Sequence, residues 1–110
     1  MERPNDLPEQ PEYQTYRTEW QGIGLEIRHC SRWLCSSGEL ITQHVEVRSA
    51  GKVPLPITDT GYRSHFMHGA EALLEFDDDP VGFMVWWLDE AAKSKEWKQK
   101  VEADRQFELF

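Results

Sequence analysis

The chain has 110 residues, of which 39% are hydrophobic, and its 20 acidic and 12 basic side chains give a net charge of −8. This length suits a single domain, and five tryptophans with five phenylalanines supply apolar surface for one core. No apolar run approaches the roughly 20 residues that span a bilayer. The net charge would repel nucleic-acid phosphates and anionic membranes. We therefore expect a globular domain without direct nucleic-acid or membrane binding, whose charge either serves solubility alone or attracts a partner protein with a basic surface.

Residues 1–12 are predicted to be a flexible tail, and residues 13–110 a single α+β domain. The tail contains three prolines, which remove backbone donors and disfavour helix, and almost no aliphatic side chains. The first six residues lack the apolar stretch of a secretory signal. Cys30 and Cys35 are compatible with a reducing compartment. These features predict a cytoplasmic protein.

Two segments, 22–29 and 41–48, alternate between apolar and polar residues, which predicts half-buried strands. Their outer faces carry opposite charges, so we expect them to be antiparallel neighbours. The connection 30–40 is predicted to be a long loop. Two prolines in 53–58 limit that stretch to a sheet edge or a crossing segment. Residues 62–67 are predicted to form a third short strand, with Tyr62, Ser64 and Phe66 on one side.

A helix is predicted to begin after Asp79, which can cap it, with Pro80 in the first position. It should run to about Lys93 and bury one face, made of Phe83, Met84, Trp87, Leu88 and Ala91 and widened by Val85 and Trp86. Residues 69–76 are expected to form two helical turns. Ser94 either caps a second helix or lies within a continuing one. The predicted fold is α+β, a small antiparallel sheet of about three strands packed against one or two C-terminal helices.

Candidate metal ligands and nucleophiles do not form recognisable constellations. His29, Cys30, Cys35 and His44 lie within sixteen residues, but no second pair of ligands completes a zinc site. His65 and His68 would point to opposite faces of a strand. Ser64 and His65 are neighbours in sequence, which is the wrong relationship for a catalytic Ser–His pair. No Gly-x-Ser-x-Gly elbow or phosphate-binding loop is present. We therefore predict no catalytic residue, no cofactor and no metal.

The stretch 55–66, with the sequence LPITDTGYRSHF, places seven side chains capable of hydrogen bonding around one glycine. One interpretation is a turn held by the side chains of Asp59 and Thr60, with Arg63 paired to a local carboxylate. The other is a binding loop in which Tyr62, Arg63 and His65, beside Asp59, contact a ligand.

This stretch resembles a motif found in short proteins of bacterial mobile elements and plasmids. The following sequence VGFMVWWLDEAAKSKEW is similar too, and the resemblance covers roughly residues 20–97. It implies a bacterial or phage origin and an accessory or anti-defence role. It carries no catalytic residue or activity over to this chain.

Five carboxylates fall within nine residues, and no lysine or arginine lies between His68 and Lys93. We expect the acidic segment to face a partner; its members are Glu71, Glu75, Asp77, Asp78 and Asp79, with Asp89 and Glu90. A simpler interpretation is a solvated loop that favours the helix dipole. The sequence thus predicts a non-enzymatic, acidic interaction protein that binds a basic protein surface. The alternative is a small ligand-binding module or enzyme that uses the Tyr62–His65 loop. A third possibility, nucleic-acid binding by the lysines of 93–100, is weakened by Glu96.

Overall fold

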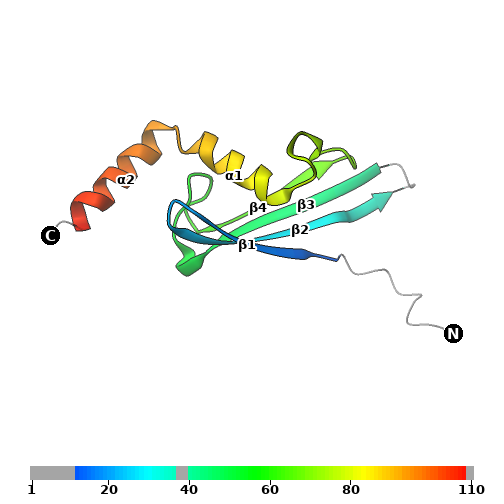
Figure 1. Cartoon of the computed structure of the whole chain (residues 1–110), viewed down its shortest axis with the longest axis horizontal. Helices are drawn as coiled ribbons and strands as arrows, with labels where there is room; N and C mark the ends of the chain where they lie inside the picture. Colours follow the sequence, from blue (N-terminus) through cyan, green and yellow to red (C-terminus); the bar gives the residue numbers. More distant parts are fainter. Residues whose placement is uncertain (1–11, 37–39, 109–110) are drawn as a thin grey trace.

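A computed structural model of the chain describes residues 12–36 and 40–108, and Figure 1 shows how the elements are arranged. The predicted flexible tail falls almost entirely on residues 1–11, outside this described part, so that prediction stays untested. The described residues form an antiparallel sheet followed by two C-terminal helices, which confirms the α+β class. The sheet has four strands in this part of the chain, so the expected count of about three is wrong.

The strands follow one another in the sheet in chain order, each antiparallel to the next. They are β1 (Gln14–Trp20), β2 (Ile23–Ser36), β3 (Leu40–Ser49) and β4 (Tyr62–His68). The sequence pattern does not predict β1, because this edge strand is rich in polar residues and lacks aliphatic ones. It joins β2 through Gln21 and Gly22, whose φ angles of 50° and 79° suit a two-residue hairpin turn.

The predicted antiparallel pairing of the second and third strands is confirmed. Glu26 lies opposite Arg48 and Arg28 lies opposite Glu46, so the opposite charges pair as expected. Strand β2 is longer than predicted and continues to Ser36, with a register shift between Cys30 and Leu34. The expected loop 30–40 is therefore strand over much of its length.

Helix α1 (Pro80–Ala91) packs its apolar face on one face of the sheet, which we call the covered face. The Asp79 side chain accepts a 2.9 Å hydrogen bond from the backbone N–H of Val81, so the predicted cap is confirmed. Met84 and Leu88 are fully buried against the core residues of the strands: Trp20, Leu25, Ile27, Val45, Val47 and Met67. Trp86 is 49% exposed, so the expectation that it widens the buried face is wrong.

The connections on either side of β4 contain little regular structure. A 3-10 turn η2 (Ala50–Lys52) follows β3, and residues 53–61 stay outside the sheet, as the prolines predict. Leu55 and Thr58 form an isolated bridge. After β4, the chain makes turns and one 3-10 helix η3 (Leu74–Phe76) in place of two α-helical turns. Leu73 is nonetheless buried in the core.

A second helix, α2 (Lys95–Glu108), is separate from α1 and projects away from the sheet (Figure 1). Ser94 Oγ accepts a 3.1 Å hydrogen bond from the backbone N–H of Trp97, so Ser94 caps this helix. Trp97 packs against Trp20, with 5.9 Å between ring centroids. No helix among the described residues is long and apolar enough to cross a bilayer.

Candidate functional site

Most of the acidic segment predicted from the sequence, from Glu71 to Asp79, lies in the connection between β4 and α1. Its side chains Glu71, Glu75, Asp77 and Asp78 are all exposed. None of the four forms an ion pair with another described residue. Their charges therefore act outward into solvent rather than within the fold.

The two aspartates also have a local structural cause. Asp77 and Asp78 have φ angles of 55° and 59°, in the left-handed region that aspartate tolerates better than most residues. Their backbone N–H groups each donate a 3.0 Å hydrogen bond, to the carbonyls of Leu74 and Leu73 respectively. This geometry reverses the chain just before the Asp79 cap. The turn thus needs residues that tolerate a left-handed φ, such as aspartate. The carboxylates of Asp77 and Asp78 still remain free to interact with a partner.

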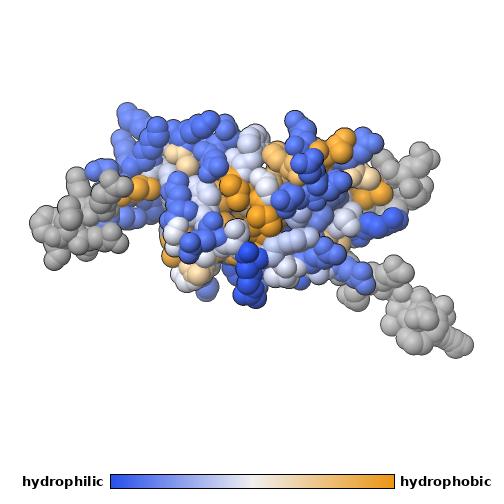
Figure 2. All heavy atoms as spheres, in the orientation of Figure 1, coloured by the Kyte–Doolittle hydropathy of each residue, from blue (hydrophilic) through white to orange (hydrophobic). Residues whose placement is uncertain are grey.

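Aromatic side chains lie directly beside this acidic turn. Phe76 contacts Phe83 and Trp86, with 5.5 Å between ring centroids in both pairs. Leu74 is 60% exposed and Trp86 is 49% exposed. Figure 2 shows hydrophobic atoms over the connection between β4 and α1, bordered by hydrophilic ones. We call the whole region the acidic–aromatic surface; it comprises Leu74, Phe76, Trp86, Glu71, Glu75, Asp77 and Asp78.

The other three acids of the predicted surface have partners in the fold, and one of them, Asp79, is the cap of α1 described above. Asp89 Oδ1 accepts a 2.8 Å hydrogen bond from Trp20 Nε1. Glu90 forms a 2.9 Å ion pair with Lys93 one helical turn further along. Both follow Trp86 on the same side of α1, three and four residues later. Their charge adds to the acidic character of this region, but Asp89 also holds the fold together.

The Tyr62–His65 segment is the start of strand β4 rather than a loop. Strand alternation places Tyr62 on the face opposite α1, which we call the open face, and Arg63 and His65 on the covered face. The structure therefore does not bring these three side chains into one site. Asp59 lies exposed in the preceding turn, apart from them.

One of the two side chains expected to hold the turn before β4, that of Thr60, does so, together with Thr58. The hydroxyl groups of Thr58 and Thr60 donate hydrogen bonds of 2.9 and 3.3 Å to the carbonyl of Tyr62. The predicted role of Asp59 in holding this turn is thus taken by Thr58. Arg63 donates a 2.9 Å bond to the carbonyl of Ile57, rather than pairing with a carboxylate.

His65 lies between the sheet and α1. Its ring is 5.0 Å from the ring of Trp87 and 6.0 Å from that of Phe83, centroid to centroid. Burial lowers the pKa of His65 from its ordinary value, and the nearby Arg63 lowers it further. A neutral imidazole packed on aromatic rings serves the core, which favours a structural role for this residue.

The open face carries an aromatic cluster that the sequence analysis did not identify. Phe66 stacks on His44, with 4.5 Å between centroids, and Trp33 contacts Phe66 at 4.8 Å. Tyr13 Oη and His44 Nδ1 are 2.5 Å apart. These rings come from four separate segments of the chain, so no local motif contains the cluster. The one signal in the sequence is the alternation of 41–48 and 62–67, which places His44 and Phe66 on outer faces.

Next to this cluster, charged side chains neutralise one another across the strands. Glu46 accepts hydrogen bonds from Arg28 and from Tyr62 Oη, both at 3.1 Å. Arg17 pairs with Glu26 at 3.0 Å. Burial lowers the pKa of His44, an effect that Glu46 opposes and Arg28 reinforces. These charged groups of the open face are therefore paired within the face.

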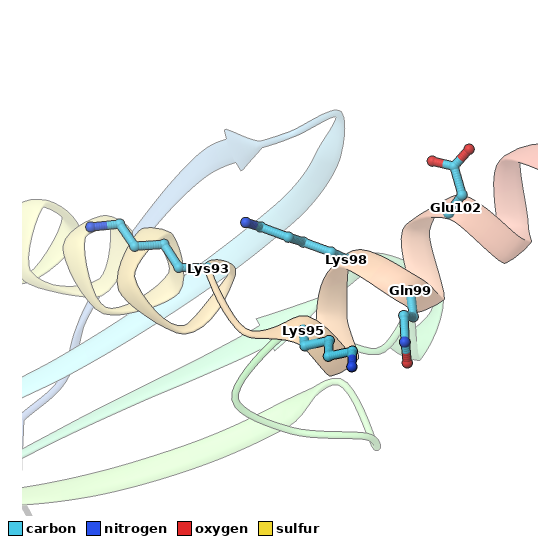
Figure 3. Close-up of a pocket in the computed structure, with 5 residues that line it drawn as sticks. All are labelled: Lys93, Lys95, Lys98, Gln99 and Glu102. Atoms are coloured by element: carbon cyan, nitrogen blue, oxygen red, sulfur yellow. The ribbon is translucent and has the colours of Figure 1, made fainter.

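A shallow hollow follows α1 and is lined by Lys93, Lys95, Lys98, Gln99 and Glu102. Figure 3 shows that their side chains point in different directions rather than toward a common centre. Lys93 is already paired with Glu90. Among the described residues, no three or more His, Cys, Asp or Glu side chains are grouped so that they could hold a metal ion.

The strands and α1, with the start of α2, match one known family model. The model is described as the KlcB third domain, and it matches residues 13–97. The chain belongs to the KlcB third-domain family. The match begins just before β1 and ends at Trp97, the residue that packs on Trp20, so the family domain contains the whole described sheet, the acidic–aromatic surface and the open face. Neither a curated protein nor a solved structure matches the chain.

Proposed function

We propose that this KlcB third-domain protein is a non-enzymatic interaction module that binds a basic segment of a partner protein through the acidic–aromatic surface. One observation supports this most strongly: exposed apolar side chains, Leu74 and Trp86, lie beside four carboxylates that have no cationic partner among the described residues. Apolar side chains provide area to bury. The carboxylates provide charge that steers a basic partner and selects against acidic ones.

The chemistry of this surface supports one kind of partner. A segment that fits it must carry lysine or arginine next to apolar side chains, as in a basic amphipathic helix. An accessory or anti-defence role, implied by the motif resemblance, would suit such a partner, since nucleic-acid-binding proteins commonly present basic surfaces.

The alternative, a ligand-binding module or enzyme built on Tyr62, Arg63 and His65, has less support. Tyr62 contacts Glu46 on the open face, whereas Arg63 and His65 contact Trp87 on the covered face. A ligand would have to pass through the sheet to touch all three.

A synthetic amphipathic helix with a leucine stripe and a lysine stripe tests the proposal. Fluorescence anisotropy of the labelled peptide should show binding that weakens as salt is raised. Asp77→Asn with Asp78→Asn should slow association roughly tenfold at low salt, and it should leave the fold intact because asparagine also tolerates left-handed φ. Trp86→Ala should instead speed dissociation.

The matched control is Glu96→Gln with Glu102→Gln, which removes the same charge from exposed positions on α2. This variant should bind nearly as the parent does. If both double variants weaken binding equally, only net charge matters and the proposed site is wrong. A peptide with glutamate in place of lysine should not bind.

A further inference from the structure

The open face of the sheet is a second exposed surface, and the proposed function does not use it. Trp33, Tyr62 and Phe66 are each 38–44% exposed there. Arg28 lies over the ring of Tyr13 at 4.3 Å, and Arg48 over the ring of Tyr62 at 5.3 Å. Tryptophan, tyrosine and arginine are the residues most enriched at the energetic centres of protein interfaces.

Several polar groups on this face are already paired, so covering those groups would leave few of them unsatisfied. Glu46 is only 7% exposed and accepts bonds from both Arg28 and Tyr62. His44, also 7% exposed, is bonded to Tyr13 and stacked on Phe66. Burying an unpaired polar group is costly, whereas burying a paired one costs much less.

The charge of the open face differs from that of the chain as a whole. Where the register is continuous, outside the shifted part of β2 between Cys30 and Leu34, alternation places equal numbers of arginines and glutamates on the open face: Arg17, Arg28 and Arg48 with Glu19, Glu26 and Glu46. These three positive and three negative charges cancel, while the chain carries −8. A basic partner or a nucleic acid gains little from a balanced face. A second copy of the chain, which also carries a charge of −8, is repelled by the acidic parts of the surface but not by this balanced face.

We propose that the open face is a self-association surface, on which a second copy of this chain packs its own open face. The contact is isologous, with the aromatic cluster and the paired charges of each copy facing those of the other. It rests on residues different from those of the acidic–aromatic surface, so each proposal can fail without the other.

Sedimentation equilibrium of the full chain tests this directly. The chain should be in equilibrium between monomer and dimer, and the dimer should strengthen as salt is raised, because salt screens the repulsion between two acidic copies. The binding of a basic peptide should show the opposite salt dependence. A chain that stays monomeric at the highest concentration reached overturns the proposal.

Charge reversal on the open face identifies the interface. Arg17→Glu with Arg48→Glu removes two positive charges from each balanced face and adds two negative ones, which makes its net charge more negative by four, and it should weaken the dimer roughly tenfold or more. Lys95→Glu with Lys98→Glu makes the same change in net charge on α2 and should weaken it much less. If both double variants weaken the dimer equally, the interface lies elsewhere. If Arg17→Glu with Arg48→Glu does not fold, the single variant Arg48→Glu replaces it in the same dimerisation measurement.

Hydroxyl-radical footprinting locates the contact independently. Above the dimerisation concentration, Trp33 and Phe66 should become protected from oxidation, while Trp86 on α1 should not. Protection of Trp86 without Trp33 would overturn the assignment of the interface to the open face. Protection of Trp33 and Phe66 by a single-stranded oligonucleotide, in a chain that stays monomeric, would assign the face to nucleic acid instead.

Discussion

The indole Nε1 of Trp20 donates a 2.8 Å hydrogen bond to Oδ1 of Asp89 and thereby joins the end of strand β1 to helix α1. Trp20 is 4% exposed, and its ring also contacts Trp97 of α2. One residue at the end of an edge strand thus meets both helices. Without its acceptor, the indole N–H would be a buried donor with no partner, so this contact carries more weight than a surface ion pair.

Asp89→Ala should lower the free energy of unfolding by about 1–3 kcal/mol, the cost of leaving a buried donor unsatisfied. Glu90→Ala is the matched control, because its ion pair with Lys93 is exposed at both ends and such pairs contribute about 0–1 kcal/mol. Urea denaturation of both variants measures the difference. Equal losses would show that the Trp20–Asp89 bond has no special role.

Leu88→Ala should cost about 2–5 kcal/mol, because Leu88 is fully buried and its loss leaves a cavity. Trp86→Ala, two residues earlier on the same helix, should cost less than about 1 kcal/mol, because that side chain is half exposed. Trp87→Ala should fall between them, since Trp87 is only partly buried. Denaturation midpoints in the reverse order would show that the helix presents a different face to the sheet.

Gly61→Ala should destabilise the protein strongly. Gly61 has a φ of 79°, and a Cβ there would lie 2.5 Å from Ser49 Oγ and 2.7 Å from the backbone of Lys52. Gly22 has the same φ of 79° but no atom within 4 Å of a Cβ position. Gly22→Ala therefore suffers only the conformational penalty of about 1 kcal/mol, and Gly61→Ala should exceed it clearly in the same thermal or urea measurement. Similar losses would mean that the β3–β4 connection moves to make room.

Stability should decrease as the pH falls below about 6.5. Burial lowers the pKa of both His65 and His44, so the unfolded chain binds protons at a higher pH than the folded chain does. The free energy of unfolding is then at its full value above the unfolded pKa and declines as acid protonates the unfolded state. Urea denaturation between about pH 7.5 and 5.5 checks this, and His44→Gln with His65→Gln should flatten the profile. A slope that survives in the double variant would assign it to other groups.

Local patterns in the sequence predict several elements correctly, because each depends on neighbouring residues. The alternation in 22–29 and 41–48 predicts β2 and β3 and their charge-paired register. Asp79 followed by Pro80 predicts where α1 begins, and the spacing of Met84 and Leu88 predicts which side of it is buried. The alternation over 62–67 already implies that Tyr62 lies on the face opposite Arg63 and His65.

Other features depend on contacts between distant segments, and only the tertiary structure decided them. Strand β1 has a polar sequence and forms because β2 offers a partner edge and Trp20 reaches Asp89, 69 residues away. The open-face cluster joins Tyr13, Trp33, His44 and Phe66 through strand register, including a shift between Cys30 and Leu34 that local propensity does not encode. The sequence alone shows the acidic run. The exposure of Leu74 and Trp86 beside it depends on how η3 packs on α1. Helical spacing identifies the apolar side chains, but only the packed structure determines which of them the sheet leaves uncovered.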